Sequence, residues 1–157
     1  MYTEKDLQDI SAQLTKRRCA VWVPAAVLGA AVVVCFVLRI EWLTNVLALL
    51  LGAGLIFGLG IWVRPVSMYR KHLNNVLHGR TRELTGQFKE MENETVVRDG
   101  VKYYPMTLTV GDPEKPVDDR LFYYDANLPR PDWQAGETLT VTSHDKELGN
   151  WVRVAAN

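Results

Sequence analysis

Residues 19–38 (CAVWVPAAVLGAAVVVCFVL) and 42–63 (WLTNVLALLLGAGLIFGLGIWV) decide the fold that the sequence predicts. Neither stretch contains a charged residue, and only Arg39, Ile40 and Glu41 separate them. An apolar helix of about 20 residues, at 1.5 Å rise per residue, covers the roughly 30 Å hydrocarbon core of a bilayer. We therefore expect a multi-pass membrane protein with two transmembrane helices, TM1 over about 19–38 and TM2 over about 42–63, joined by a tight turn.

Charged and aromatic residues at the ends of these stretches predict their orientation. Basic residues are numerous before the first stretch and after the second, whereas the turn contains only Arg39. Cytoplasmic flanks of membrane helices are enriched in lysine and arginine, and tryptophan concentrates at both interfaces. We therefore expect an integral protein of the cell membrane with both termini in the cytoplasm. The expected interface anchors are Trp22, Trp42, Trp62, Lys16, Arg17, Arg18 and Arg64.

Small residues in both stretches predict close helix packing. Ala25 and Gly29 lie in the first stretch, and Gly54-x-x-x-Gly58 lies in the second. Without a Cβ atom, two backbones in lipid approach closely and gain dispersion contact. The hairpin is expected either to pack on itself alone or to associate with another copy or another membrane protein. Neither stretch contains an ionisable Asp, Glu, His, Lys or Arg, which argues against a transporter or pump.

Two amphipathic helices are predicted beside the hairpin. In residues 1–18, Leu7, Ile10 and Leu14 recur at helical spacing after a possible cap at Thr3, and the segment is expected to rest at the membrane surface. Residues 64–79 carry an apolar stripe and end at Gly79, which predicts a linker helix. The predicted organisation is therefore 1–18, the hairpin 19–63, the linker 64–79 and a cytoplasmic domain 80–157.

Alternating apolar residues and turn signals predict that residues 80–157 form a small antiparallel β-barrel of OB or SH3-like type, giving an α+β chain. Asp99-Gly100 is a strong hairpin signal because type I′ turns need positive φ at both central residues. Gly86 and Pro105 suggest a bulge or an edge where the sheet bends. Gly149-Asn150 is interpreted as a turn before the last strand. The expected strands cover 83–91, 95–98, 101–110, 120–124, 138–143 and 151–155.

The sequence offers little to support catalysis or metal binding, and we expect neither an enzyme nor a cofactor. Both cysteines lie in the first apolar stretch, so 80–157 has neither a disulfide nor a cysteine zinc site. Ser143-His144-Asp145 holds triad residue types, but consecutive strand residues point in opposite directions, so we expect a strand end running into a turn. His72 and His78 lie about 240° apart on a helix and cannot share a metal.

Aromatic residues are the more informative signal in 80–157. Tyr103, Tyr124 and Trp133 are predicted as an exposed surface that contacts a protein partner, whereas cross-strand packing is the simpler explanation. OB barrels also stack single-stranded bases on such rings. Residues 80–157 hold ten basic and fourteen acidic residues, however, and the net charge of −4 argues against nucleic acid.

Gly136-Glu137-Thr138-Leu139-Thr140-Val141 resembles the glycine-then-strand step of the barrels in short NfeD-like proteins. Those proteins also place a small OB barrel after transmembrane helices. The resemblance implies the same layout here and extends no further along the chain.

The sequence thus predicts a non-enzymatic scaffold or accessory subunit. Its hairpin would anchor in the bilayer and self-associate or dock on another membrane protein, and its barrel would bind a protein partner. The alternative is a membrane-bound sensor whose barrel encloses an apolar pocket for a small molecule.

Overall fold

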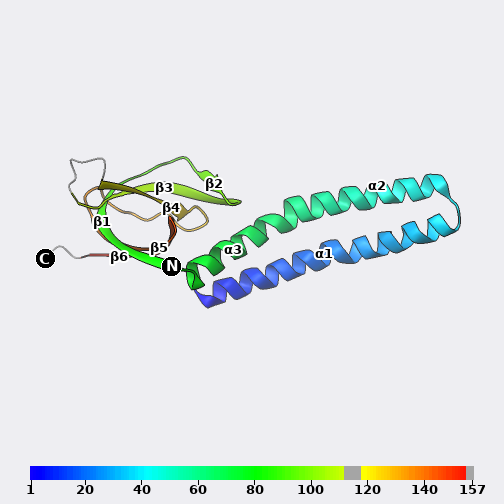
Figure 1. Cartoon of the computed structure of the whole chain (residues 1–157), viewed down its shortest axis with the longest axis horizontal. Helices are drawn as coiled ribbons and strands as arrows, with labels where there is room; N and C mark the ends of the chain where they lie inside the picture. The colour runs from blue at the N-terminus through cyan, green and yellow to red at the C-terminus, as the bar shows by residue number, and fades with distance from the viewer. Residues whose placement is uncertain (112–117, 155–157) are drawn as a thin grey trace. The chain divides into compact units, whose positions relative to one another are not determined.

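The computed structural model describes residues 1–111 and 118–154 (Figure 1). The chain forms two compact units. One consists of Gln8–Arg70, and the other combines Met1–Leu7 with Lys71–Asn157. The boundaries between the units therefore lie within helices rather than in loops.

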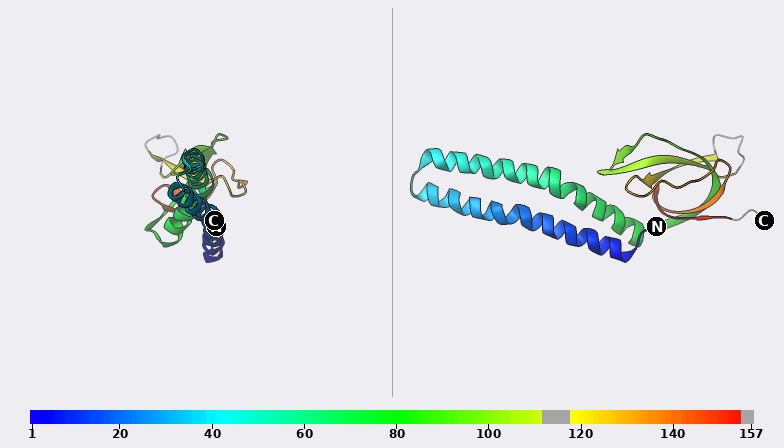
Figure 2. Two further views of the ribbon diagram at one scale, coloured as in Figure 1. Left: turned by 90° about the vertical axis from the view of Figure 1, so that its right-hand side faces the viewer. Right: turned by 180° about the vertical axis from the view of Figure 1, so that it is seen from behind.

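The first unit is built from two antiparallel helices that lie side by side (Figures 1 and 2). Helix α1 spans Glu4–Val37, and helix α2 spans Glu41–Phe57. The reversal between them is tight, because Arg39 adopts φ 56° and the N–H of Ile40 donates to the Cys35 carbonyl. By length and composition, α1 and the continuous helical segment Glu41–His78 are each apolar enough to cross a membrane, and little of their apolar stretches is buried within the chain.

The second helical segment changes its winding before it ends. A π-helical stretch, η1, spans Gly58–Val63, and α3 follows over Arg64–His78. In η1 the N–H of Arg64 donates to the Leu59 carbonyl five residues earlier. The buried side chains that join α1 to this segment are Leu14, Val21, Val63 and Val66. Apolar packing at the open end of the hairpin thus holds the two helical segments together.

The strands of the second unit form a closed five-stranded barrel with one added strand. The strands are β1 (Thr81–Met91), β2 (Val96–Arg98), β3 (Val101–Thr109), β4 (Asp119–Asp125), β5 (Thr138–His144) and β6 (Glu147–Arg153). Around the barrel the order is β1-β5-β6-β4-β3, and pairing of β3 with β1 closes it. The short β2 lies outside this ring and pairs with β3.

Strand β1 closes the barrel because it pairs with a different strand in each half. Residues 81–87 pair with β5, whereas 87–91 pair with β3, and the register shifts between Phe88 and Glu90. Gly86 lies just before this change of partner. A Cβ atom there would lie 2.8 Å from the Thr109 carbonyl oxygen, so the close approach requires glycine.

One face of each strand fills the barrel interior. The buried cluster comprises Phe88, Met106, Leu108, Phe122, Tyr124, Trp133, Leu139, Val141 and Leu148. Trp133 makes three aromatic contacts there: its ring centroid lies 5.0 to 5.7 Å from those of Phe88, Tyr124 and the partly buried Trp151. Dispersion and apolar burial therefore stabilise the barrel core.

The structure confirms two long apolar helices followed by a small barrel in an α+β chain, and it changes several details. The hairpin at Asp99-Gly100 is confirmed, with φ values of 49° and 77°. The turn predicted at Gly149-Asn150 is wrong, because both residues lie within β6. The chain reverses instead at Asp145, where φ is 58°, so Ser143-His144-Asp145 is indeed a strand end and a turn.

The structure differs from the predictions in two further respects, the continuity of the first helix and the direction of one strand pairing. Residues 4–18 and the first apolar stretch form the single helix α1, with Thr3 capping it through the Asp6 N–H. The barrel is not wholly antiparallel, since β4 and β6 run parallel where Tyr123 pairs with Glu147. Local sequence patterns do not encode this pairing because it joins strands separated by β5.

Candidate functional site

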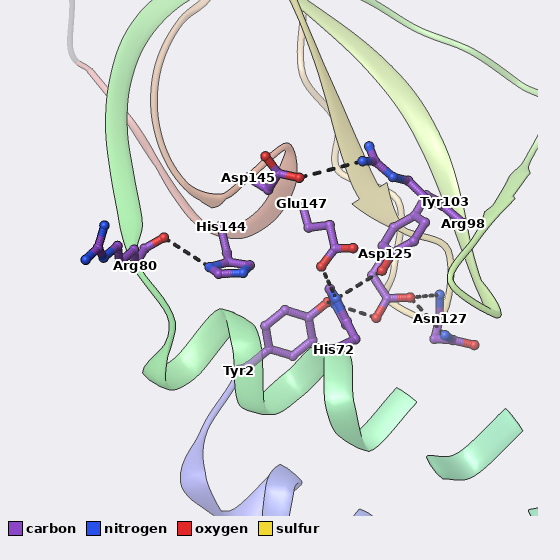
Figure 3. Close-up of polar contacts among 10 residues, drawn as sticks. All are labelled: Tyr2, His72, Arg80, Arg98, Tyr103, Asp125, Asn127, His144, Asp145 and Glu147. Carbon is purple, nitrogen blue, oxygen red and sulfur yellow. Dashed lines mark hydrogen bonds and ion pairs between the residues drawn. The ribbon is translucent and has the colours of Figure 1, made fainter. Parts of the chain in front are cut away.

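The most elaborate polar arrangement in the barrel unit is a buried cluster of five side chains (Figure 3). Tyr103 on β3 and Asp125 on β4 are direct partners in the strand ladder, on the face opposite the barrel interior. Glu147 begins β6, His72 lies on α3, and Tyr2 precedes α1. Five chain segments thus contribute one group each to the cluster.

His72 occupies the centre of this cluster. Its Nδ1 atom lies 2.8 Å from Glu147 Oε2 and 3.0 Å from the Tyr103 hydroxyl oxygen. Its Nε2 atom lies 3.2 Å from the Tyr2 hydroxyl oxygen. Only 4% of His72 is exposed, so these contacts replace the water that the ring would otherwise bind.

Asp125 is fully buried and has its own hydrogen bonds. The Tyr2 hydroxyl donates to Asp125 Oδ2 over 2.8 Å. The other carboxylate oxygen accepts from both the backbone N–H and the side-chain amide of Asn127, each over 2.8 Å. The turn after β4 therefore supplies the donors that a buried carboxylate requires.

The Tyr2 hydroxyl connects His72 to Asp125, because its oxygen lies within hydrogen-bond distance of both His72 Nε2 and the Asp125 carboxylate. Tyr2 thus joins the imidazole and the buried carboxylate in one network.

Two other groups in the cluster have displaced pKa values. Burial opposes ionisation of Glu147, but hydrogen bonds from His72 and Tyr103 and the charge of His72 outweigh it, so the pKa of Glu147 is lowered. Burial, followed by the negative charges of Glu147 and Asp125, raises the pKa of the Tyr103 hydroxyl. At neutral pH the cluster thus contains an ionised glutamate and a neutral tyrosine.

Access limits what this cluster can do chemically. Tyr103 and Asp125 are fully buried, so a substrate cannot reach the groups beside His72 without displacing α3 or Tyr2. Among the described residues, no group of three or more His, Cys, Asp or Glu side chains could hold a metal ion. The contacts therefore fix Tyr2 and His72 on the outer face of the barrel.

The three predicted partner-binding residues are not an exposed surface, and that expectation is wrong. Tyr103, Tyr124 and Trp133 are all buried. Tyr124 and Trp133 face the barrel interior, where Tyr124 also donates to the Pro129 carbonyl over 2.7 Å. Tyr103 lies on the opposite face, but His72 covers it. Strand alternation thus correctly predicts that one tyrosine, Tyr103, points away from the barrel interior. It is buried nevertheless, because His72 of α3 packs against it.

The residues predicted to pack the apolar helices divide into two groups. A Cβ atom on Gly58 would lie 3.0 Å from the Val21 side chain, so this glycine faces α1 within the chain. Gly29 has a looser neighbour, Leu51, at 4.0 Å, and Ala25 is half-buried. Gly54 has no described atom within 4 Å of its Cβ position. Of the two glycines in Gly54-x-x-x-Gly58, only Gly58 thus lies against a described side chain.

The predicted anchor residues lie at the ends of the apolar stretches, and two of them touch. Arg17 Nη1 donates to the Trp62 carbonyl over 2.9 Å, and its guanidinium carbon lies 5.9 Å from the centroid of the Trp62 ring. Trp22, Trp42 and Trp62 are each about half exposed or more. The exposed basic members of the set are Lys16, Arg18 and Arg64.

Sequence reasoning missed Tyr2, His72, Asp125 and Glu147. One signal was present, because His72 lies on the same apolar stripe of α3 as Leu73 and Val76, where an ionisable side chain needs buried partners. Those partners lie on strands remote in sequence, so the stripe alone does not identify them.

Comparison with protein families, with curated proteins and with solved structures finds no match. The resemblance to short NfeD-like proteins therefore rests on the stretch 136–141 and on the layout alone.

Replacing His72 with alanine should lower the free energy of unfolding by about 3–5 kcal/mol, because Glu147 loses its buried partner at Nδ1 and Tyr2 loses its partner at Nε2. The matched control is His78→Ala on the same helix, whose contact with Glu4 is more than half exposed and should cost at most about 1 kcal/mol. Urea unfolding of the full chain in detergent, followed by tryptophan fluorescence, measures both. Equal losses in the two variants would contradict the central role of His72.

Glu147→Gln should flatten the acid dependence of stability. The folded pKa of Glu147 is lowered, so its ionised form stabilises the fold above the unfolded value of about 4.3, and this contribution is lost as the pH falls through the folded pKa. Below about pH 4.3 the wild-type protein should therefore lose unfolding free energy more steeply than Glu147→Gln, whereas above about pH 6 their difference should be constant. Parallel stability curves from neutral to acid pH would contradict the assignment.

Proposed function

We propose that this chain is a membrane-anchored, non-enzymatic scaffold or accessory subunit. Helices α1 and α2 insert in the cell membrane as a hairpin, both termini lie in the cytoplasm, and the barrel binds a protein partner. The observation that carries the proposal is the apolar surface of the hairpin, which the chain itself leaves uncovered.

The exposed side chains support lipid as the solvent of the hairpin. Phe36, Trp42 and Leu49 are each at least 70% exposed, and similar residues recur along both apolar stretches. A continuous apolar surface of this kind marks a membrane or protein contact. Helices also satisfy their backbone hydrogen bonds internally, as hydrocarbon demands.

The strand arrangement supports an OB-type barrel. Numbered along the chain without β2, the five barrel strands follow the cyclic order 1-2-3-5-4, with the third and fifth parallel. OB barrels are five-stranded Greek-key barrels that serve many unrelated binding functions. The sensor alternative needs an enclosed apolar pocket, whereas the described barrel interior holds a cluster of buried core side chains.

Membrane insertion has a direct test in native membranes. The full chain should remain in the membrane pellet after extraction with alkaline carbonate and should dissolve only with detergent, because about 40 apolar residues hold it in lipid. Protease added outside intact cells should leave the barrel uncut, and protease added to inverted vesicles should remove it. Release by carbonate alone would overturn the anchor, and cleavage from outside would reverse the orientation.

Gly54→Leu and Gly58→Leu should separate association between copies from packing within one hairpin. Leucine at Gly54 meets no described side chain, so it should leave the fold intact and reduce self-association by blocking close approach of a second helix. Leucine at Gly58 would collide with Val21 and should cost about 1–3 kcal/mol of stability. Light scattering in detergent reports the mass, and thermal unfolding reports the stability. An unchanged mass for Gly54→Leu would remove self-association through this face.

A further inference from the structure

The contact between Arg17 and Trp62 joins α1 to the end of the second apolar stretch. The guanidinium of Arg17 donates to the Trp62 backbone carbonyl and also approaches the indole ring. Arg17 is half-buried there, so its position is defined by two independent contacts. A guanidinium has five N–H donors, and the bond to Trp62 uses one of them.

Three more cations lie within a helical turn of this contact. Lys16 and Arg18 are the sequence neighbours of Arg17, and Arg64 follows Trp62 by two residues. All three are exposed, and none forms an ion pair or side-chain hydrogen bond with the described residues. Within Gln8–Arg70 the acidic residues are Asp9 and Glu41, which are seven or more residues away from all four cations. Within Gln8–Arg70 these cations therefore have no carboxylate within six residues along the sequence.

These cations stand at the boundary of the apolar surface. Residue 19 begins the first uncharged stretch and residue 63 ends the second, so the four cations directly border both. In a bilayer this depth is occupied by the phosphates of the lipid headgroups. Long basic side chains extend toward that layer while their stems remain in contact with apolar surface.

We propose that Lys16, Arg17, Arg18 and Arg64, with Trp62, form a basic rim at the edge of the apolar surface that binds the phosphates of anionic phospholipids. The inference rests on the membrane insertion proposed above. A zwitterionic headgroup brings an ammonium that these cations repel and that no nearby carboxylate accepts. An anionic headgroup brings negative charge alone, so the charge pattern selects it. The Trp62 ring, 47% exposed, provides the amphipathic contact at the same depth.

Native mass spectrometry of the full chain in non-ionic detergent tests the selectivity. The probes are phosphatidylglycerol and phosphatidylcholine with identical acyl chains. The wild-type protein should retain phosphatidylglycerol in preference to phosphatidylcholine. Arg18→Gln/Arg64→Gln should weaken phosphatidylglycerol binding by about fivefold for each charge removed. The control Arg80→Gln/Arg82→Gln removes the same charge from exposed positions at the start of the barrel and should bind as wild type does.

The other outcomes of this experiment contradict the lipid site or replace it with a different one. Equal retention of the two lipids by the wild-type protein, or an equal loss in the control variant, would overturn the site. Excess inorganic phosphate should not displace the lipid, and complete displacement would identify a free-anion site instead. Membrane insertion fails separately, through release of the chain by alkaline carbonate. A chain that stays in the membrane but does not discriminate between the lipids overturns the lipid site alone.

Discussion

Two helices that cannot bury their own apolar surface constrain the rest of this chain. The stretches 19–38 and 42–63 contain no charge, and a two-helix hairpin covers only one narrow face of each helix. The described residues that are buried within the two stretches are Val21, Cys35 and Val63. The remaining apolar side chains require a solvent or a partner that is itself apolar. The charged side chains of the helical unit therefore all lie outside these two stretches.

The π-helical stretch η1 contains a backbone carbonyl that accepts a hydrogen bond from a side chain of α1. In a π-helical stretch each backbone N–H donates to the carbonyl five residues earlier instead of four, as Arg64 does to Leu59. Here the Trp62 carbonyl accepts from Arg17 on α1. The same arginine thus bonds a backbone group, contacts an aromatic ring and contributes positive charge at the limit of the apolar surface. Arg17 therefore takes part both in the pairing of the two helical segments and in the positive charge on which the lipid proposal depends.

The sequence predicts the parts of the fold that depend on local chemistry. Uncharged runs identified both long helices, and Asp99-Gly100 identified the β2–β3 hairpin because its turn needs positive φ. Local signals failed where distant strands decide the outcome. Gly149 looked like a turn residue, but it lies in β6, which pairs with β5, and a Cβ atom there would lie 2.6 Å from Val76 Cγ1. Tyr103 looked exposed, and its burial depends on His72, which lies thirty-one residues earlier.

The polar cluster fixes residues 71–78 of α3 on the barrel more narrowly than apolar contact alone would. Leu73 and Val76 are also buried, but apolar contact by itself has little directional preference. His72 allows no such freedom, because Nδ1 must meet Glu147 while Nε2 meets Tyr2. Burying these charges is costly, and well-packed apolar residues could give equal stability. What the polar cluster adds is a unique arrangement. Only one rotation of residues 71–78 and one position of Tyr2 allow all of its hydrogen bonds to form together.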